Sequence, residues 1–427
     1  MRISMFTNTY KPHVGGVARS VAFFAEDLRA LGHRVLVAAP EFPGARAEDE
    51  DEDLLRVPAI QEFNGSDFSV RLPTPFLVDQ KMETFVPEIV HSHHPFLMGD
   101  TALRVARSRN LPLVFTHHTL YEKYTHYVPL DSEAMKRFVI HLATEYANFA
   151  TRVVAPSESI ARLIRERGVR RPVAVVPTGV DLAFFEKGRG QAFRRDHGIP
   201  GDVPVVGHLG RLAPEKNLTY LARAVAAFLR GRAEVRFLVV GEGPSREPIR
   251  QALEAQGVAD QLVLAGQLSG RALADAYQAM DLFVFASRSE TQGMVLAEAM
   301  AADKPVVALD ASGTREVVED DVNGRLLPGD ADEAAFAAAV AEFFDRPERA
   351  RRWTTQAGRT AREFSRETSA RKLLEVYEGA RADAAADREG VPRGLSVYDE
   401  LMEKLKLEWD LISQKMIAAA EAVRPEE

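Results

Sequence analysis

The sequence has no cysteine and no long apolar run. None of its 427 residues is cysteine, which excludes disulfide bonds and thiolate metal sites. Every apolar run falls far short of the roughly 18 residues that a membrane-spanning helix needs. The start, Met1-Arg2-Ile3, leads into a predicted strand rather than a signal peptide. We therefore expect a cytosolic protein without a membrane span.

An excess of positive charge is absent too. The net charge of −8 argues against general nucleic-acid binding. Apolar residues make up 46% of the chain and charged residues 27%, as in soluble globular proteins. A chain of this length exceeds one ordinary hydrophobic core, so we expect two or three domains.

Strand and helix patterns alternate along the chain in two sets. The first set has predicted strands at 2–7, 33–39, 85–92, 111–116, 152–155 and 173–176. The second set has predicted strands at 205–209, 235–240, 262–265, 281–286 and 305–309. Such alternation is typical of doubly wound parallel sheets. We predict an α/β fold with two Rossmann-like domains facing across a cleft, joined by a polar connector that ends at Pro204.

The stretch 281–302, DLFVFASRSETQGMVLAEAMAA, predicts a buried strand, then a polar loop, and then a helix that begins near Gly293. A helix start at the carboxyl edge of a parallel sheet suits an anion such as a phosphate. Glu290 precedes the helix, and Glu298 lies inside it among apolar residues, where a carboxylate needs a partner. Either the two carboxylates bind one long ligand, or Glu290 complements the helix dipole and Glu298 is solvated.

Two other loops add phosphate-binding features. Gly15-Gly16 lies between the first strand and its helix, where it forms either a phosphate loop or a tight turn. Arg211 and Lys216 follow a strand end, where ligands gather in such sheets. Two cations and a helix start beside two carboxylates describe a site for a diphosphate with hydroxyl-rich groups at both ends, such as a nucleotide-sugar.

Several features of the first half leave two interpretations open. Histidines follow two neighbouring strand ends, so either a zinc site or, preferably, a single substrate-facing His118 is expected. The aromatic loop 121–129 is either a packed lid or an acceptor-binding wall. The acidic run 48–53 is expected to be a solvated loop rather than a metal site. An arginine cluster around 152–171 is either a solvated face or a contact for an anionic membrane.

Five motifs in order resemble the retaining glycosyltransferases of family 4, which have the GT-B fold. They are HVGGV at 13–17, GRLAPEKN at 210–217, GEGP at 241–244, the E-x7-E of Glu290 and Glu298, and the Asn323-Gly324 turn. The match covers about 1–380. It implies an acceptor-side domain at 1–177 joined by helix 366–380, a nucleotide-sugar domain at 178–365, and an extension at 381–427. Within the extension, 381–390 is a predicted linker and 398–420 a predicted amphipathic helix.

The resemblance also implies roles for single residues. Arg211 and Lys216 would hold the donor diphosphate, Glu298 the ribose and Glu290 the transferred sugar. The backbone N–H groups of Gly293, Met294 and Val295 would meet the sugar and the β-phosphate. Gly16 would allow close approach to the phosphates, His118 would lie near the anomeric carbon, and no metal ion would be required. Tyr121, Glu122, Tyr124 and His126 would line the acceptor side, while Gln292 replaces an aromatic residue that is common in the family.

The segment THHTLYEKYTHYVP at 116–129 looks like that of bacterial diacylglycerol glucosyltransferases, which use UDP-glucose. The expected enzyme is cytoplasmic and peripheral on the inner membrane face, and it makes an α-glucosyl diacylglycerol. One alternative is a soluble sugar or sugar-phosphate acceptor. Others are a nucleotide-sugar 2-epimerase, which would lack the E-x7-E pair, and an inactive binding protein.

Overall fold

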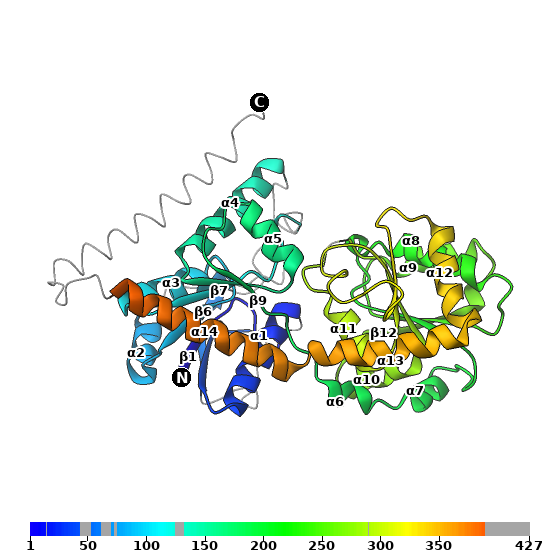
Figure 1. Cartoon of the computed structure of the whole chain (residues 1–427), viewed down its shortest axis with the longest axis horizontal. Coiled ribbons are helices and arrows are strands. Elements are labelled where there is room, and N and C mark those ends of the chain that lie inside the picture. Colours follow the sequence, from blue (N-terminus) through cyan, green and yellow to red (C-terminus); the bar gives the residue numbers. More distant parts are fainter. Residues whose placement is uncertain are drawn as a thin grey trace. The chain divides into compact units, whose positions relative to one another are not determined.

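The computed structural model describes residues 1–13, 15–42, 53–60, 70–71, 75–123, 132–288 and 290–388. The chain divides into two compact units (Figure 1). The first joins Met1–Thr178 to the chain that begins at Ser369, and the second is Gly179–Thr368. The sequence prediction placed these boundaries after 177 and after 365. No helix among the described residues is long and apolar enough to cross a membrane.

The first unit is a parallel sheet of seven strands in the order β3-β2-β1-β6-β7-β8-β9. The strands are β1 (Arg2–Phe6), β2 (Arg34–Pro40), β3 (Leu54–Val57), β6 (Ile89–Ser92), β7 (Leu113–Thr116), β8 (Arg152–Ala155) and β9 (Val173–Val175). A short antiparallel pair joins β4 (Ala59–Ile60) and β5 (Val70–Arg71). The order reverses beside β1, as in doubly wound sheets, which places ligands at the carboxyl ends of the central strands.

Helices cover both faces of this sheet. They are α1 (Gly16–Ala30), α2 (Pro75–Phe85), α3 (Met98–Ser108), α4 (Glu133–Phe149), α5 (Glu158–Glu166) and α14 (Arg366–Arg388), with the 3-10 turn η3 (Tyr121–Lys123). One core packs α2, α3, α4 and α5 against the sheet. The other packs α1 and α14 on the opposite face, where Leu373, Val376 and Tyr377 are buried. The last described helix therefore completes the core of the first unit.

The second unit is a parallel sheet of six strands in the order β12-β11-β10-β13-β14-β15. Its strands are β10 (Val205–Leu209), β11 (Arg236–Val240), β12 (Leu262–Gly266), β13 (Leu282–Phe285), β14 (Val306–Leu309) and β15 (Gly324–Leu327). Its helices are α6 (Leu182–Glu186), α7 (Gly190–Asp196), α8 (Leu218–Leu229), α9 (Arg246–Glu254), α10 (Gly270–Ala279), α11 (Met294–Ala301), α12 (Glu333–Asp345) and α13 (Pro347–Glu363). The 3-10 turns η5 (Pro214–Lys216) and η6 (Ala259–Gln261) complete it.

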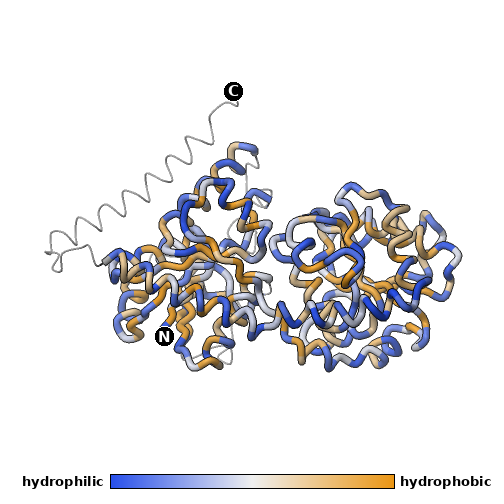
Figure 2. The backbone as a smooth tube through the Cα atoms, viewed as in Figure 1, coloured by the Kyte–Doolittle hydropathy of each residue, from blue (hydrophilic) through white to orange (hydrophobic). Residues whose placement is uncertain are grey.

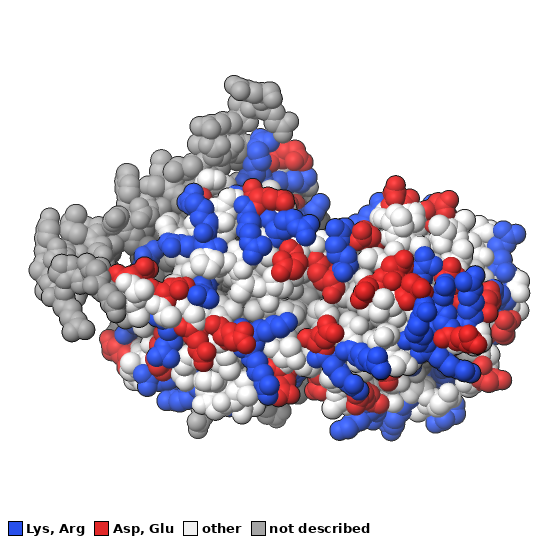
Figure 3. Space-filling view, in the orientation of Figure 1, with Lys and Arg blue, Asp and Glu red and all other residues white. Residues whose placement is uncertain are grey.

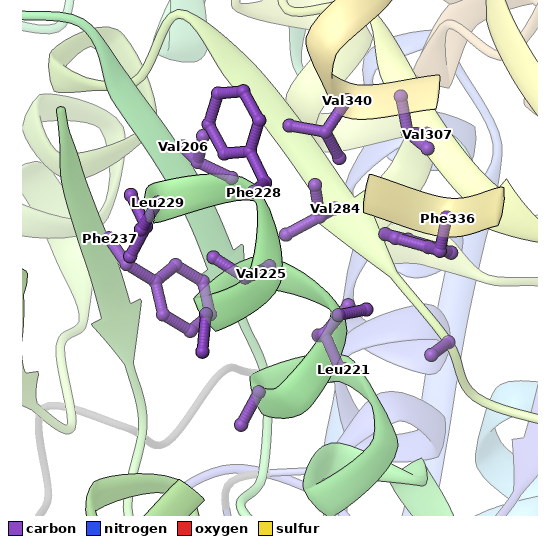
Figure 4. Packing of buried hydrophobic residues seen from close by; sticks show 14 of the residues in the cluster. Val206, Leu221, Val225, Phe228, Leu229, Phe237, Val284, Val307, Phe336 and Val340 are labelled. Atoms are coloured by element: carbon purple, nitrogen blue, oxygen red, sulfur yellow. The ribbon is translucent and has the colours of Figure 1, made fainter. Parts of the chain in front are cut away.

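Two apolar layers hold this second sheet. Leu221, Val225 and Phe228 of α8 point toward β10, β11 and β13, while Phe336 and Val340 of α12 pack beside them (Figure 4). Helices α6, α7, α10 and α11 bury their apolar residues on the other face. Hydrophobic segments run through the interior of each unit, and hydrophilic segments are frequent at its surface (Figure 2). Strands buried on both faces read as short continuous apolar runs, which is why the sequence predicts them well.

Three sequence predictions are wrong. The connector that was predicted to end at Pro204 instead contains α6 and α7, and Arg194 of α7 is buried and bonds Asp281 (3.0 Å). The predicted strand 85–92 is shorter, because Phe85 ends α2 and β6 begins at Ile89. The predicted linker at 381 is helical, because α14 continues to Arg388. An ion pair of Asp383 with Arg152 (2.6 Å) ties that last part of α14 to the sheet.

Candidate active site

The loop after β13 leads into α11 through a left-handed glycine. Gly293 has φ 70° and precedes the first helical residue, Met294. A Cβ there would lie 2.9 Å from the Gly313 carbonyl oxygen and 2.9 Å from Leu296 Cδ1, so both the turn and the packing require glycine. The first N–H groups of α11 have no acceptor within the helix. The predicted strand-loop-helix order is confirmed, and it presents backbone donors at the sheet edge.

Lys216 and Glu290 form a close ion pair at this edge. The Lys216 Nζ lies 2.6 Å from Glu290 Oε1, and each side chain is 16% exposed. Lys216 ends η5, directly after β10, whereas Glu290 follows β13, the neighbouring strand. Two residues that are 74 positions apart in the sequence are thus held together at one point of the sheet edge. The sequence placed both residues in this site.

Arg211 lies in the same loop as Lys216 but is oriented by its own partner. Its guanidinium pairs with Glu215 (2.5 Å), and its side chain is 48% exposed. The backbone around it is tightly packed, since a Cβ on Gly241 would lie 1.9 Å from the Gly210 carbonyl oxygen. Gly241 has φ 141°, a value that favours glycine. The GEGP motif after β11 therefore supports the loop that carries Arg211.

Glu298 is a buried carboxylate with a hydrogen-bond donor. Its side chain faces inward from α11, and the residue is 3% exposed. The Tyr277 hydroxyl of α10 donates to Glu298 Oε2 at 2.9 Å. The sequence predicted that Glu298 needs a partner but did not identify Tyr277. The missed signal was a tyrosine on the apolar side of α10, where its hydroxyl must find an acceptor.

His208 in β10 is a second residue that the sequence analysis missed. It is 1% exposed, and its Nδ1 lies 3.0 Å from the Val284 carbonyl oxygen, so Nδ1 carries the proton. Its Nε2 has no hydrogen-bond partner among the described residues and faces Gly210. Burial lowers the pKa of His208 to about 4, against the opposing effect of the hydrogen bond to Val284. The ring is therefore neutral at pH 7, and its acceptor nitrogen faces Gly210, at the start of the loop that carries Arg211 and Lys216.

In the first unit, histidines after β6 and β7 contact one another. His93 Nδ1 lies 2.9 Å from His118 Nε2. His91 uses both ring nitrogens, with Tyr377 Oη and Thr116 Oγ1 each at 2.7 Å. Burial lowers the pKa of His93 and His118 well below 6.5. Within the described ranges, no group of three or more His, Asp or Glu side chains could hold a metal ion.

The other predicted site residues of the first unit have different environments. Gly16 begins α1, and no atom lies within 4 Å of the position that a Cβ would occupy there. The carboxylate of Glu122 in η3 forms an ion pair with Arg167 (2.6 Å). The buried Tyr121 hydroxyl has no partner among the described residues. Tyr124 and His126 lie outside the described residues, as do 48–52 of the acidic run.

Two protein-family models together match most of the chain. The model described as Glycosyltransferase Family 4 matches residues 14–184, and that described as Glycosyl transferases group 1 matches 190–360. The chain is 29% identical to an alpha-monoglucosyldiacylglycerol synthase of Streptococcus pneumoniae over 80% of this chain and 78% of the relative. It is 34% identical to a GDP-mannose-dependent alpha-mannosyltransferase of Mycolicibacterium smegmatis over 80% of this chain and 88% of the relative.

The fold matches solved glycosyltransferase structures. The Anabaena protein HepE, solved in complex with UDP, aligns with a TM-score of 0.70 at 22% identity. The alignment covers 89% of this chain and all of HepE. At this identity the likeness concerns the fold, which confirms the predicted GT-B architecture. From the two family models, the relatives that it matches over most of their length, and the fold, the chain belongs to the family 4 glycosyltransferases and is a hexosyltransferase.

Proposed function

We propose that this enzyme transfers glucose from UDP-glucose to diacylglycerol with retention of the anomeric configuration. The donor half of the proposal is supported by the Lys216–Glu290 pair, which precedes α11, and by the buried Glu298 within α11. The acceptor half is supported by relatives named alpha-monoglucosyldiacylglycerol synthase, from Streptococcus pneumoniae and Acholeplasma laidlawii, both 29% identical.

In the proposed site, the two ends of the donor meet two carboxylates. Glu298 accepts hydrogen bonds from the ribose, and Glu290 accepts them from hydroxyls of the sugar. When the donor binds, Lys216 leaves Glu290 and binds the diphosphate. Arg211 and the N–H groups of Gly293, Met294 and Val295 bind the diphosphate and the sugar as well. Bond cleavage develops negative charge on the leaving phosphate, and fixed cations and aligned amides stabilise it without a metal ion.

The acceptor attacks on the face from which the diphosphate leaves. No described carboxylate is proposed as a covalent nucleophile, so the leaving phosphate itself takes the acceptor proton. His118 lies beside the anomeric carbon in this proposal, and Gly16 lets the backbone approach the phosphates. His118→Ala is expected to reduce transfer more than UDP affinity, and a stronger loss of UDP binding would place His118 elsewhere.

A membrane surface would supply the lipid acceptor. Arg162 and Arg165 of α5 and Arg170 and Arg171 after it are exposed. An anionic leaflet attracts such residues with about 1 kcal/mol each. Basic and acidic side chains are interspersed over the visible face (Figure 3), so any attraction is local. Arg152 and Arg167 do not contribute, because Asp383 and Glu122 pair with them.

The test is a panel of donors against diacylglycerol, read by mass spectrometry. UDP-glucose should give a glucosyl lipid, whereas GDP-mannose and UDP-N-acetylglucosamine should give little product. Transfer from GDP-mannose alone would refute the donor assignment. Sedimentation with liposomes, with and without anionic lipid, tests the surface, and Arg162→Glu with Arg170→Glu should weaken binding to anionic liposomes.

A soluble acceptor is the second candidate. Relatives named D-inositol 3-phosphate glycosyltransferase, one of them from Kineococcus radiotolerans and 32% identical over 72% of this chain, favour it. Turnover of a water-soluble sugar phosphate together with failure to bind liposomes would establish this alternative. The choice of acceptor separates the two candidates and the donor panel does not, because the same UDP-sugar can serve both acceptors.

A further inference from the structure

His93 and His118 form a hydrogen-bonded pair of neutral imidazoles. Their nearest nitrogens, His93 Nδ1 and His118 Nε2, lie 2.9 Å apart, and the rings stack at 5.2 Å with an angle of 23°. A hydrogen bond of this length needs one proton between the two nitrogens. Because neither ring is charged at pH 7, each carries only one N–H. The proton on this bond therefore determines the tautomers of both histidines.

The other nitrogen of His93 decides between the two arrangements. His93 is fully buried, and its Nε2 has no hydrogen-bond partner among the described residues. If His118 donated, His93 would carry its proton on Nε2 as a buried N–H without an acceptor. If His93 donates from Nδ1, its Nε2 is only an acceptor without a donor. A buried orphan N–H is the rarer of the two in folded proteins. His93 is therefore the donor.

The surroundings hold the His93 ring in this orientation. His91 stacks on it with ring centroids 4.0 Å apart. His91 itself is fixed from both sides, by the Tyr377 hydroxyl of α14 and by Thr116 at the end of β7. Both nitrogens of His91 are already hydrogen-bonded, so His91 does not bond the His93 ring. Among the described residues, the imidazole of His118 is therefore the one hydrogen-bond partner of the His93 ring.

We propose that His93 is a positioning residue, which holds His118 in the tautomer protonated on Nδ1 and so makes it a hydrogen-bond donor to the ligand. The proposal rests on the proposed function only in placing His118 beside the donor sugar. His118 Nε2 accepts from His93, and Nδ1 is the nitrogen left for a ligand oxygen. His118 then donates to a hydroxyl or phosphate oxygen and takes no proton from the acceptor.

Tautomers can be read directly from the full-length protein by ¹⁵N NMR of the imidazole nitrogens. His118 should carry its proton on Nδ1 in the wild-type enzyme. His93→Leu, apolar and similar in volume, removes the donor, so His118 should shift toward the Nε2–H form that free histidine prefers. His93→Asn keeps an N–H close to the former Nδ1 and should restore the Nδ1–H form. A wild-type His118 protonated on Nε2 would overturn the proposal.

Kinetics provide the second readout. His93→Leu should lower kcat by about 10- to 100-fold, the usual cost of removing a partner that orients a histidine. KM for the donor should change less than about twofold, and His93→Asn should recover most of kcat. In a His118→Ala background, His93→Leu should add no further loss, because it acts through His118. An undiminished loss in that background would indicate a merely structural role.

The two proposals fail in different ways. If wild-type enzyme does not glucosylate diacylglycerol, the proposed function is refuted while the NMR result still tests the histidine pair. The kinetic comparison is then made with whichever donor and acceptor the panel identifies. If transfer is measured but the His118 proton is on Nε2, the inference about His93 fails and the proposed function stands.

Discussion

Lowering the pH from about 7.5 to about 5.5 protonates histidines while most carboxylates stay ionised. In the first unit, burial lowers the pKa of His91 and His94 to about 3, and burial lowers that of His117 to about 4, from 6.5. In the second unit, burial does the same for His208, to about 4. The two units therefore contain different numbers of histidines that resist protonation.

The sign of the effect follows from linkage. These pKa values are lower in the folded state, so between about pH 4 and 6.5 the unfolded chain binds more protons, and stability falls as the pH drops through 6.5. At about pH 5.5 one such histidine costs about 1 kcal/mol. His91, His94 and His117 therefore remove about three times as much stability from the first unit as His208 removes from the second. His93 and His118, whose pKa values burial also lowers, add to the loss in the first unit. Total stabilities are only about 5–15 kcal/mol.

The first unit should therefore open before the second as the pH falls. Hydrogen exchange in low urea is measured by mass spectrometry at both pH values. Peptides from β6 and β7 report the opening of the first unit, and peptides from β10 and β13 report that of the second. His117→Phe is the matched variant, and it should reduce the first unit's loss of stability between the two pH values by about 1 kcal/mol. Equal losses in both units, or earlier opening of the second, would refute the reasoning.

Three further predictions concern the site. Lys216→Ala should leave the fold intact but cost about 2–4 kcal/mol of transition-state stabilisation, read as kcat, and brisk turnover by the folded variant would exclude Lys216 from the phosphate site. Tyr277→Phe removes a hydrogen bond of the buried Glu298 and should lower unfolding stability by about 1–3 kcal/mol while weakening UDP binding measured by calorimetry. Unchanged UDP affinity would separate Glu298 from the ribose. Gly16→Ala meets no atom within 4 Å, so thermal stability should be unchanged, and a fall in kcat/KM would report contact with the donor.

The fold could be predicted because its strands are buried on both faces and its main helices are amphipathic. Strands β10, β11 and β14 fall within the predicted bounds. Helices α6 and α7 were missed because they have only five and seven residues, too few for a helical period to be recognised. The end of α14 was missed because its polar surface resembles a linker, although alanine favours a helix there.

The site was predictable to the extent that it lies at strand ends. Lys216 and Glu290 follow neighbouring strands, and a parallel sheet brings their ends together. Tyr277 and His208 could not be found in this way, and the histidines after β6 and β7 were placed at strand ends without the pairing of His93 with His118. Their roles depend on which buried atom each polar nitrogen or oxygen meets, and that is fixed by side-chain packing rather than by position along the chain.

Helix α14 has a practical consequence for exchanging modules among relatives. Because the first unit is completed by residues on both sides of Gly179–Thr368, the second unit is an insertion in the chain. A graft that swaps donor preference must splice at both junctions, near 178 and near 369. A fusion with a single crossover would replace α14 by the corresponding helix of the relative. The partner of His91 at the position of Tyr377 would then come from the relative's sequence.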